Sequence, residues 1–203
     1  MKHCFARLIL SIPLIFFSQC KSGILPTEVP KTEKTIESEP GEPSETYILV
    51  DTEKEILSIR QNGSNVAEFH NIAFGSSGVG IKQKKGDNIT PLGKFSIGWI
   101  TEQSHFKLFI GLNYPTLDYA ERGLSQKIIK KKDFDHIRLA LEQGKIPPQN
   151  TALGGLIGIH GLGKASLKIH KLANWTSGCI ALDNKQIENL RRLVHPKMTV
   201  IIR

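Results

Sequence analysis

A break in composition near residue 46 limits which part of the chain can fold. Residues 21–46 are rich in Pro, Glu, Ser and Thr and show no apolar period of 2 or 3.6. Such a segment cannot bury enough apolar surface to offset its conformational entropy. We therefore predict a disordered tether over residues 20–46 and one folded domain over residues 47–203.

The first nineteen residues have the pattern of an export signal. Basic residues in the first seven positions precede an apolar run over residues 8–17, which is too short to span a bilayer. The sequence Ser-Gln-Cys that ends at Cys20 resembles a bacterial lipoprotein signal, with Gln where a small residue is usual. We predict a signal peptide over residues 1–19, lipid on Cys20, and a membrane-anchored lipoprotein in the periplasm. An uncleaved N-terminal anchor is the alternative.

The predicted domain is basic. Residues 47–203 carry 22 basic and 13 acidic residues, which suits an anionic envelope polymer as a partner. A cluster of these residues is either a solvated face or a surface that attracts such a polymer. The cluster consists of Arg122, Lys127, Lys130, Lys131, Lys132 and Arg138. Export makes nucleic acid an unexpected partner, and no membrane contact is predicted beyond the N-terminal lipid.

Short β-prone runs separated by turn residues dominate the first half of the domain. The predicted strands cover residues 47–51, 56–60, 66–74, 95–99 and 198–202, and Asn62-Gly63 marks a hairpin. The apolar spacing predicts helices over residues 133–143 and 184–194, the second with Asp183 and Gln186 in a capping box. Strands and isolated helices without βαβ alternation predict a β-rich α+β fold.

Cys179 is the only cysteine of the predicted domain, and His160 lies nineteen residues before it, at the end of an apolar run. A lone thiol in an exported protein needs an explanation. One interpretation is a nucleophile activated by a histidine that the fold brings next to it. The other is a buried structural cysteine beside a loop histidine.

The residues around this pair decide between the two interpretations. The sequences Ile-His-Gly at residues 159–161 and Trp-Thr-Ser-Gly-Cys-Ile-Ala-Leu at residues 175–182 resemble the active-site signature of the L,D-transpeptidase catalytic domain, the YkuD-like (ErfK/YbiS/YcfS/YnhG) family. Residues 85–95, 112–115 and 153–155 resemble further motifs of this family, in the same order. The resemblance covers nearly all of residues 47–203. It implies an L,D-transpeptidase-like β-sandwich with a few helices.

The resemblance also implies roles for individual residues. Cys179 matches the nucleophile and His160 the base, and the carbonyl of Gly161 is expected to orient the imidazole. The N–H groups of Gly178 and Cys179 are expected to form the oxyanion hole. The expected substrate-binding residues are Thr176, Ser177 and Asn184, of which Asn184 is also expected to fix the loop. Ser177 and Ala181 stand where many members have His and Arg, so we predict altered acceptor choice from a changed rim of the site.

The implied reaction is acyl transfer on peptidoglycan stem peptides. The thiolate attacks the amide carbonyl of the third stem residue, and the D-amino acid leaves with a proton from His160. An amine then resolves the thioester to give a cross-link or an attached protein, or water resolves it to give carboxypeptidase activity. The family often forms thioesters with carbapenems. No cofactor or metal is implied.

Three other features have competing interpretations. Cys179, His160 and His170 would make three zinc ligands, but their spacing fits no compact zinc module, and His170 is expected in an exposed loop or a pocket wall. The Gly-rich residues 75–80 are predicted to form a turn. Gly86-Asp87 and Thr90-Pro91 either form turns or position substrate.

Two alternatives to transpeptidation remain at this stage. One is a hydrolase on the same scaffold that cleaves a stem peptide bond or a link between a protein and peptidoglycan. The other is a lipoprotein that binds the wall without catalysis.

Overall fold

The computed structural model describes residues 46–203. The predicted signal peptide, Cys20 and the tether up to residue 45 lie outside the described residues. The described residues all fall within one compact unit, Ser38–Arg203. Because the main sheet and both hydrophobic clusters are complete within residues 46–203, we expect this unit to fold by itself.

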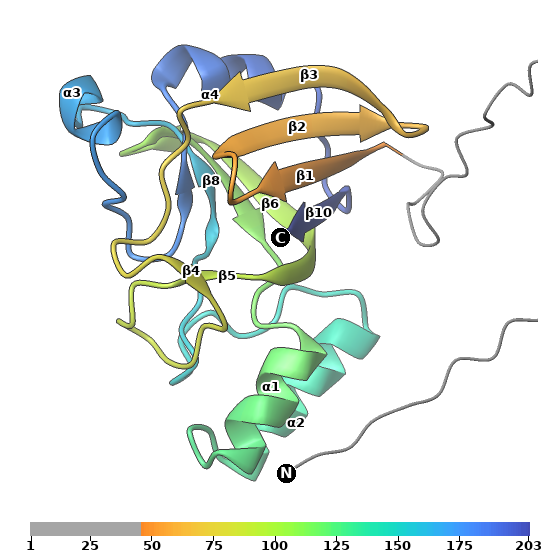
Figure 1. Ribbon diagram of the computed structural model, residues 1–203. Helices are drawn as coiled ribbons and strands as arrows, with labels where there is room; N and C mark the ends of the chain where they lie inside the picture. The colour runs from red at the N-terminus through yellow and green to blue at the C-terminus, as the bar shows by residue number, and fades with distance from the viewer. Residues whose placement is uncertain (1–45) are drawn as a thin grey trace, which may run out of the picture. The chain divides into compact units, whose positions relative to one another are not determined.

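An eight-stranded mixed sheet, in the order β3-β2-β1-β10-β6-β7-β8-β9, forms the body of the domain (Figure 1). Its strands are β1 (Tyr47–Asp51), β2 (Ile56–Gln61), β3 (Ser64–His70), β6 (Gly93–Ser104), β7 (Lys107–Leu112), β8 (Gly158–His160), β9 (Ile180–Ala181) and β10 (Thr199–Ile202). The short strands β4 (Val79–Gly80) and β5 (Thr90–Pro91) form a separate parallel pair. The β-rich α+β fold expected from the sequence is confirmed.

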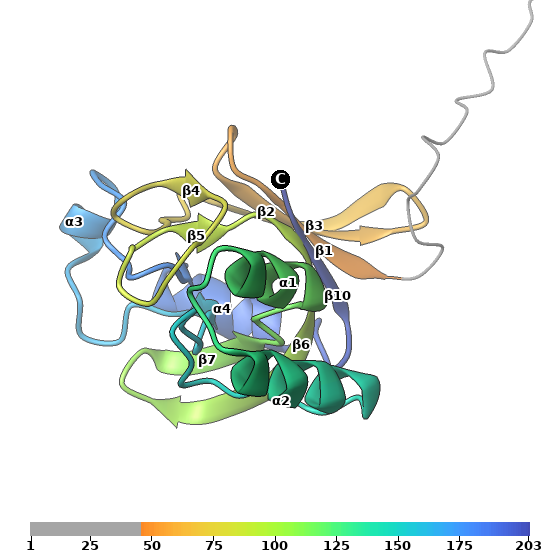
Figure 2. The ribbon, with the colours of Figure 1, turned by 90° about the horizontal axis from the view of Figure 1, so that it is seen from below.

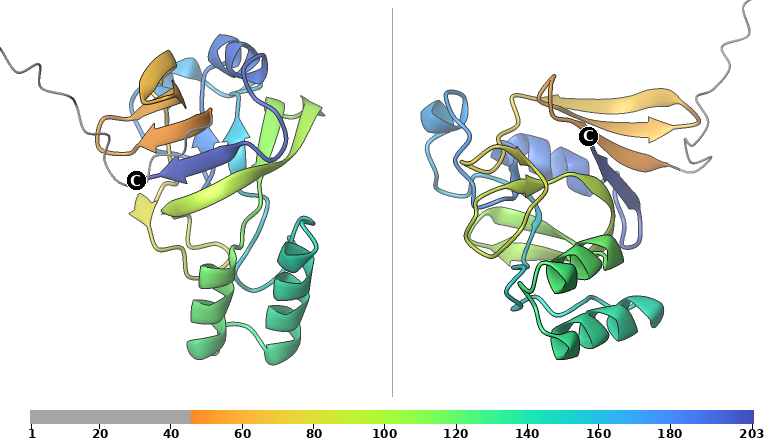
Figure 3. Two further views of the ribbon diagram at one scale, coloured as in Figure 1. Left: turned by 90° about the vertical axis from the view of Figure 1, so that its right-hand side faces the viewer. Right: turned by 60° about the horizontal axis from the view of Figure 1, so that its bottom comes forward.

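The long strand β6 joins the two halves of the sheet. Its residues 93–96 pair with β10, and its residues 97–104 pair with β7. The register shifts between Ile97 and Trp99 and again between Thr101 and Ser104. Such bulges bend a strand and increase its twist, and β6 is visibly curved (Figure 3). Side chains from both halves therefore share one hydrophobic core.

The strand predictions are right in the first half of the domain and incomplete after it. Strands β1, β2 and β10 lie where the sequence predicts them. Asn62 and Gly63 both have positive φ, 49° and 76°, as a two-residue hairpin turn requires. However, β3 ends at His70, four residues early. The outer half of β6 and the whole of β7 are not predicted.

Helices α1 (Leu117–Ser125) and α2 (Lys131–Glu142) follow β7 and precede β8 in the chain. The two helices pack side by side (Figure 2). They enclose a small apolar cluster of their own, which includes Ala120, Ile137 and Leu153. The sequence predicts α2 but not α1. The basic cluster lies on this pair of helices, where Lys131 and Arg138 form ion pairs within α2. A solvated face accounts for those two residues.

Helix α3 (Leu167–His170) is a single turn, and α4 (Asn184–Arg191) begins with the predicted capping box. The Asp183 carboxylate accepts a hydrogen bond from the Gln186 N–H at 2.7 Å, and the Gln186 side chain accepts one from the Asp183 N–H at 3.1 Å. Helix α4 ends three residues before the predicted end. None of the helices within residues 46–203 has the length and apolarity needed to cross a membrane.

Candidate active site

Neighbouring parallel strands bring the two predicted catalytic side chains together. Strand β8 ends at His160, which pairs with Ala181 in β9. Cys179 lies two residues before Ala181. Cys179 directly precedes β9, and from the alternation of side chains along a strand we expect it on the same face of the β8–β9 pair as His160. The pairing of β8 with β9 thus brings near each other two residues that lie nineteen positions apart in the chain.

His160 is buried, with 2% of its surface exposed. Its Nδ1 lies 2.7 Å from the carbonyl oxygen of Gly161. A carbonyl only accepts hydrogen bonds, so Nδ1 carries the proton and Nε2 keeps a free lone pair. Burial lowers the pKa of His160, the Gly161 carbonyl opposes this shift, and the nearby His170 lowers the pKa further. The imidazole is therefore neutral at neutral pH and able to accept a proton.

Aromatic rings hold the imidazole of His160 on several sides. The ring of Phe106 lies 4.1 Å from it, between centroids, and that of Phe109 is nearly parallel to it at 6.2 Å. The indole of Trp175 meets it edge-on at 5.9 Å. These contacts fix the ring plane and exclude water from its faces. The same rings make protonation of the imidazole less favourable.

The Cys179 side chain is a thiol at neutral pH. Burial raises its pKa to about 11, against the opposing effects of the Gly158 N–H and the Lys82 charge. Its Sγ donates a hydrogen bond to the Leu156 carbonyl oxygen at 3.4 Å. Among residues 46–203, no group of three His, Cys, Asp or Glu side chains is arranged to hold a metal ion.

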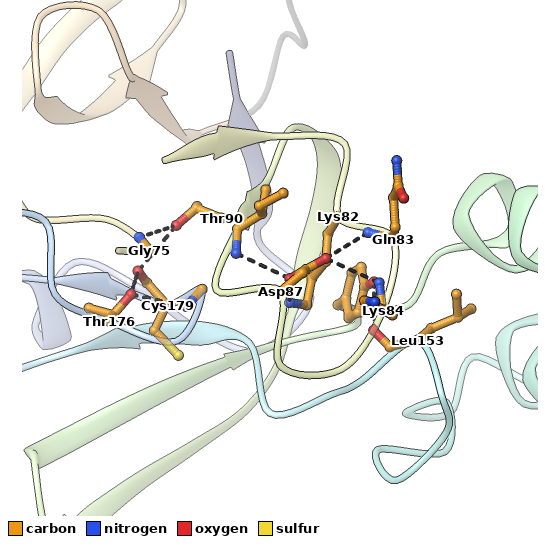
Figure 4. A network of polar contacts seen from close by, with 12 residues as sticks. Gly75, Lys82, Gln83, Lys84, Asp87, Thr90, Leu153, Thr176 and Cys179 are labelled. Carbon is orange, nitrogen blue, oxygen red and sulfur yellow. Dashed lines mark hydrogen bonds and ion pairs between the residues drawn. The ribbon is translucent and has the colours of Figure 1, made fainter. Parts of the chain in front are cut away.

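Two threonine hydroxyls fix the backbone of the Cys179 turn (Figure 4). The Thr176 hydroxyl donates to the Cys179 carbonyl oxygen at 2.7 Å and accepts from the Gly178 N–H at 3.1 Å. The Thr90 hydroxyl donates to the same carbonyl at 3.4 Å and accepts from the Gly75 N–H at 2.8 Å. A segment about ninety residues away in the chain therefore helps to set the position of the nucleophile.

Gly178 is required by the conformation of this turn. Its φ of 124° is unfavourable for other residues, and an added Cβ would lie 2.7 Å from the Ile89 carbonyl oxygen. The Gly178 N–H donates to the Thr176 hydroxyl, and its expected part in the oxyanion hole stays a prediction. The Cys179 N–H has no hydrogen-bond partner within residues 46–203 and remains the candidate.

A buried ion pair holds the loop that carries Ile89 and Thr90. The Lys82 ammonium contacts the Asp87 carboxylate, which also accepts from backbone N–H groups, among them that of Ile89 at 3.1 Å. Burial raises the pKa of Asp87, but the ion pair and the N–H donors outweigh it and hold the pKa below its usual range. Sequence reasoning considered Asp87 and Thr90 only as turn or substrate residues and missed this supporting role.

Asn184 fixes the loop that follows His160. Its Oδ1 accepts from the Gly163 N–H and its Nδ2 donates to the Gly163 carbonyl, both at 2.9 Å. Gly163 has a φ of 60°, and a Cβ there would collide with the His105 carbonyl oxygen at 1.9 Å. The expected fixing of the loop by Asn184 agrees with these contacts. Its expected role in substrate binding stays a prediction, since each amide atom makes one hydrogen bond here and keeps the capacity for another.

The other expected substrate-binding residues differ from each other. Thr176 is buried with its hydroxyl committed within the turn, so a direct substrate contact is excluded for it. Ser177 is exposed, and its role stays a prediction. Ala181 is fully buried in β9, with both backbone groups bonded to Ala73 at 2.8 and 3.0 Å. The interpretation of position 181 as part of the rim is therefore wrong.

A hollow of about 310 Å³ opens beside Cys179. Its lining includes Trp99, His105, Phe106, Phe109 and Leu156. These residues were missed as parts of the site, because most of them come from the β6–β7 hairpin, whose outer half of β6, turn and β7 the sequence did not predict. The only sequence signal was the unusual density of aromatic residues in a stretch that is otherwise polar.

Of the two expectations for His170, the exposed loop is wrong, and the pocket wall stays a prediction, since His170 lines a polar hollow. It ends α3 and is buried, and its Nδ1 accepts a hydrogen bond from the Trp175 Nε1–H at 3.4 Å. The Gly-rich residues 75–80 contain a turn, as expected. They also contribute the strand β4 and the Gly75 N–H, which donates a hydrogen bond to the Thr90 hydroxyl.

The comparisons with known proteins agree with this geometry. The family model of the L,D-transpeptidase catalytic domain (YkuD) matches residues 45–202. A comparison with curated protein sequences gives no match. Among solved structures, the helical cell shape determining protein Pgp2 from Campylobacter jejuni has a similar fold, with a TM-score of 0.52 and 23% identity. Bd1075 from Bdellovibrio bacteriovorus gives a TM-score of 0.50 and 20% identity.

These matches cover most of this chain but only part of the other proteins. They include 78% of this chain and 47% of the Pgp2 chain, and 79% of this chain and 48% of the Bd1075 chain. This chain thus spans about half the length of each of these structures. At such identities the likeness shows a common fold.

Proposed function

The chain belongs to the L,D-transpeptidase catalytic domain family, and from that premise we propose that it is an acyltransferase that acts on peptidoglycan stem peptides through Cys179. The observation that carries this proposal is the pairing of β8 with β9, which brings Cys179 and His160 near each other. The bond from Nδ1 to the Gly161 carbonyl leaves Nε2 of His160 as the proton acceptor.

The first half-reaction begins with a thiol rather than a standing thiolate. Because the pKa of Cys179 is about 11 and that of His160 is lowered, the pair rests as a neutral thiol and a neutral imidazole. Once substrate is bound and Sγ has turned away from Leu156, the proton passes from Sγ to Nε2 as Sγ begins its attack. Sγ then bonds to the carbonyl carbon of the third stem residue, and the oxyanion meets the Cys179 N–H. The C–N bond breaks, and the leaving D-amino acid takes the proton from His160.

The second half-reaction resolves the thioester. An acceptor amine gives up a proton to Nε2 of His160 and attacks the acyl carbon, which restores the thiol and yields a cross-link or an attached protein. Water in the same place yields a shortened stem peptide. The exposed Ser177 offers no imidazole to bind a charged acceptor, and this observation favours hydrolysis as the second candidate.

A wall-binding lipoprotein without catalysis is the least supported alternative. Binding alone gives no reason for the hydrogen bonds that hold the Cys179 carbonyl or for an imidazole enclosed by aromatic rings. Such preorganisation is typical of a catalytic centre.

Incubation of residues 38–203 with purified disaccharide-tetrapeptide distinguishes the three candidates. Mass spectrometry that finds cross-linked dimers indicates transpeptidation, and tripeptide alone indicates carboxypeptidase activity. An unchanged substrate, together with retention on isolated cell wall, would contradict both enzymatic assignments. The Ser177→His variant is expected to raise the ratio of dimer to tripeptide, and Ser125→His, an exposed serine at the end of α1, is its control.

Export to the cell envelope and lipid on Cys20 belong to the same proposal. The signal-like N-terminus supports them, and the basic character of residues 47–203 supports an anionic envelope polymer as a further partner. Labelled fatty acid should enter the full chain and be absent from Cys20→Ala. The cell-shape role in the name of Pgp2 supports a part for this chain in wall remodelling.

A further inference from the structure

The segment between Gly163 and Trp175, which we call the α3 segment, turns almost all of its side chains to solvent. Every residue from 164 to 169 and from 171 to 174 is exposed. Large aliphatic side chains are among them: Leu167, Ile169 and Leu172 are 46%, 58% and 74% exposed. In Figure 1 the segment lies at the outer edge of the domain, far from the α1–α2 pair.

The α3 segment is nevertheless held in place. Its single buried side chain, His170, accepts a hydrogen bond from Trp175, and Trp175 packs edge-on against His160. The Ser166 hydroxyl accepts from the Ile169 N–H at 3.4 Å and caps the turn. The aliphatic side chains therefore project from a fixed turn beside the active site. Exposure of this much apolar surface in one short segment needs a partner to explain it.

The charge of the α3 segment points to the chemistry of that partner. Lys164, Lys168 and Lys171 alternate with the aliphatic residues, and no Asp or Glu occurs between residues 143 and 182. None of these lysines forms an ion pair with another described residue. Two acids lie near this region: Glu55 lines a polar hollow with Lys171 and Leu172, and the charge of Asp183 reaches the buried His170.

We propose that the α3 segment docks the catalytic domain on an anionic lipid surface. Aliphatic side chains interleaved with lysines are the combination that enters a bilayer interface, with the ammonium groups at the phosphates and the apolar groups below them. The α3 segment is a projecting turn. It has no aromatic side chain on which a sugar could stack and no groove in which a peptide could be held by hydrogen bonds. A lipid surface is the partner that requires neither.

This docking goes beyond acyl transfer and does not depend on it. It adds a second membrane contact to the predicted lipid on Cys20. Because Trp175 links the α3 segment to His160, docking also sets the active site close to the lipid surface. The enzyme would then act on stem peptides next to the membrane rather than throughout the wall.

Co-sedimentation with vesicles tests the proposal on residues 38–203, which carry their own core and lack the N-terminal signal. Vesicles of phosphatidylcholine with phosphatidylglycerol should bind the protein, and vesicles of phosphatidylcholine alone should bind it much less. A lysine near an anionic surface contributes about 1 kcal/mol, or about fivefold in affinity. Changing Lys164, Lys168 and Lys171 to Gln should therefore weaken binding about 100-fold. Leu167→Ser with Ile169→Ser should abolish the part of binding that resists salt.

A matched variant removes the same charge elsewhere. Changing the exposed Lys127, Lys130 and Lys132 to Gln should weaken binding only slightly. Equal losses in both triple variants would overturn the proposal in favour of general attraction. Absence of binding to anionic vesicles would also overturn it, as would retention on isolated peptidoglycan that only the α3 variants lose. Tetrapeptide turnover in solution is a separate readout, so failure of one proposal does not affect the other.

Discussion

The turn that carries Cys179 and the α3 segment follow each other in the chain but are built in opposite ways. In the turn, the carbonyl of Cys179 accepts two hydrogen bonds, and the Gly178 N–H and Thr176 hydroxyl are both committed. In the α3 segment, His170 is the only buried side chain. The comparison shows how one stretch of chain separates two tasks. The turn holds the backbone of Cys179 in place, and the α3 segment presents side chains to its surroundings.

Both regions are tied to distant parts of the chain, but through different groups. The backbone of the Cys179 turn is held by the Thr90 hydroxyl, which also accepts from the Gly75 N–H. The α3 segment is capped locally by Ser166 and joined to the sheet by Asn174, whose side chain accepts from the Phe74 N–H at 2.8 Å, while its aliphatic side chains and lysines stay exposed. We expect changes in the turn to affect both activity and stability, and changes in the α3 segment to affect neither in solution.

The largest effect is expected at the nucleophile. Cys179→Ala should abolish tetrapeptide turnover and the carbapenem adduct together, because Cys179 is the only thiol in residues 46–203. Intact-mass spectrometry of residues 38–203 after carbapenem treatment measures this, and digestion should place the adduct on the peptide that contains Cys179. An adduct that persists in the variant would disprove the assignment.

A smaller loss is expected at the base. His160→Gln should slow acylation about 10²- to 10⁴-fold, the range of a positioned acid–base group. His136→Gln on α2, an exposed histidine outside the site, should change nothing. Because the pKa of His160 is lowered, the wild-type rate should fall with acid only below the ordinary histidine pKa of about 6.5. An acid limb above that value would contradict this protonation scheme.

Two adjacent residues of the turn, the buried Thr176 and the exposed Ser177, test the comparison between hydrogen-bonded and exposed side chains. Thr176→Val keeps the shape but leaves the buried Gly178 N–H without an acceptor, at a cost of about 1–3 kcal/mol in the free energy of unfolding. Acylation should slow as the nucleophile loses its fixed position. Ser177→Ala, one exposed residue further, should change the free energy of unfolding by less than about 0.5 kcal/mol. Urea unfolding measures both, and equal effects would contradict the described network.

The smallest effect is expected in the α3 segment. Ile169→Ala should change the free energy of unfolding by less than about 0.5 kcal/mol, because the side chain is exposed. Ile180→Ala, next to Cys179 and fully buried, should cost about 2–5 kcal/mol. A large loss at Ile169 would show that the α3 segment supports the core rather than presenting a surface.

Short-range sequence signals predicted the features of the fold that depend only on neighbouring residues, such as a hairpin turn and a helix cap. The Asn62-Gly63 turn and the Asp183 capping box are both short-range devices, and both are present. The β6–β7 hairpin was missed because its turn has no Gly or Asn, and Lys107 takes the positive φ of 72° instead. Helix α1 was missed because it is short and contains Gly123.

The residues of the candidate site also fall into two groups, those that a local motif identifies and those that only the folded structure identifies. A motif resemblance could assign Cys179 and His160, since each lies in a contiguous stretch of characteristic residues. It could not assign Thr90 or Phe106, which reach the site through long-range pairing in an unpredicted part of the sheet. It also placed Thr176 and Asn184 on the substrate, whereas their hydrogen bonds within the loops only emerge from the folded backbone.

The position of β10 has a consequence for folding during synthesis of the protein. Residues 199–202 lie between β1 and β6, in the middle of the sheet rather than at its edge. This strand is synthesised about 150 residues after β1, so β1 and β6 have no strand between them until then. Until then the chain has no complete core to resist unfolding, the condition in which a chain can be threaded through a narrow channel. Removal of residues 199–203 should leave β1 and β6 without the strand that lies between them.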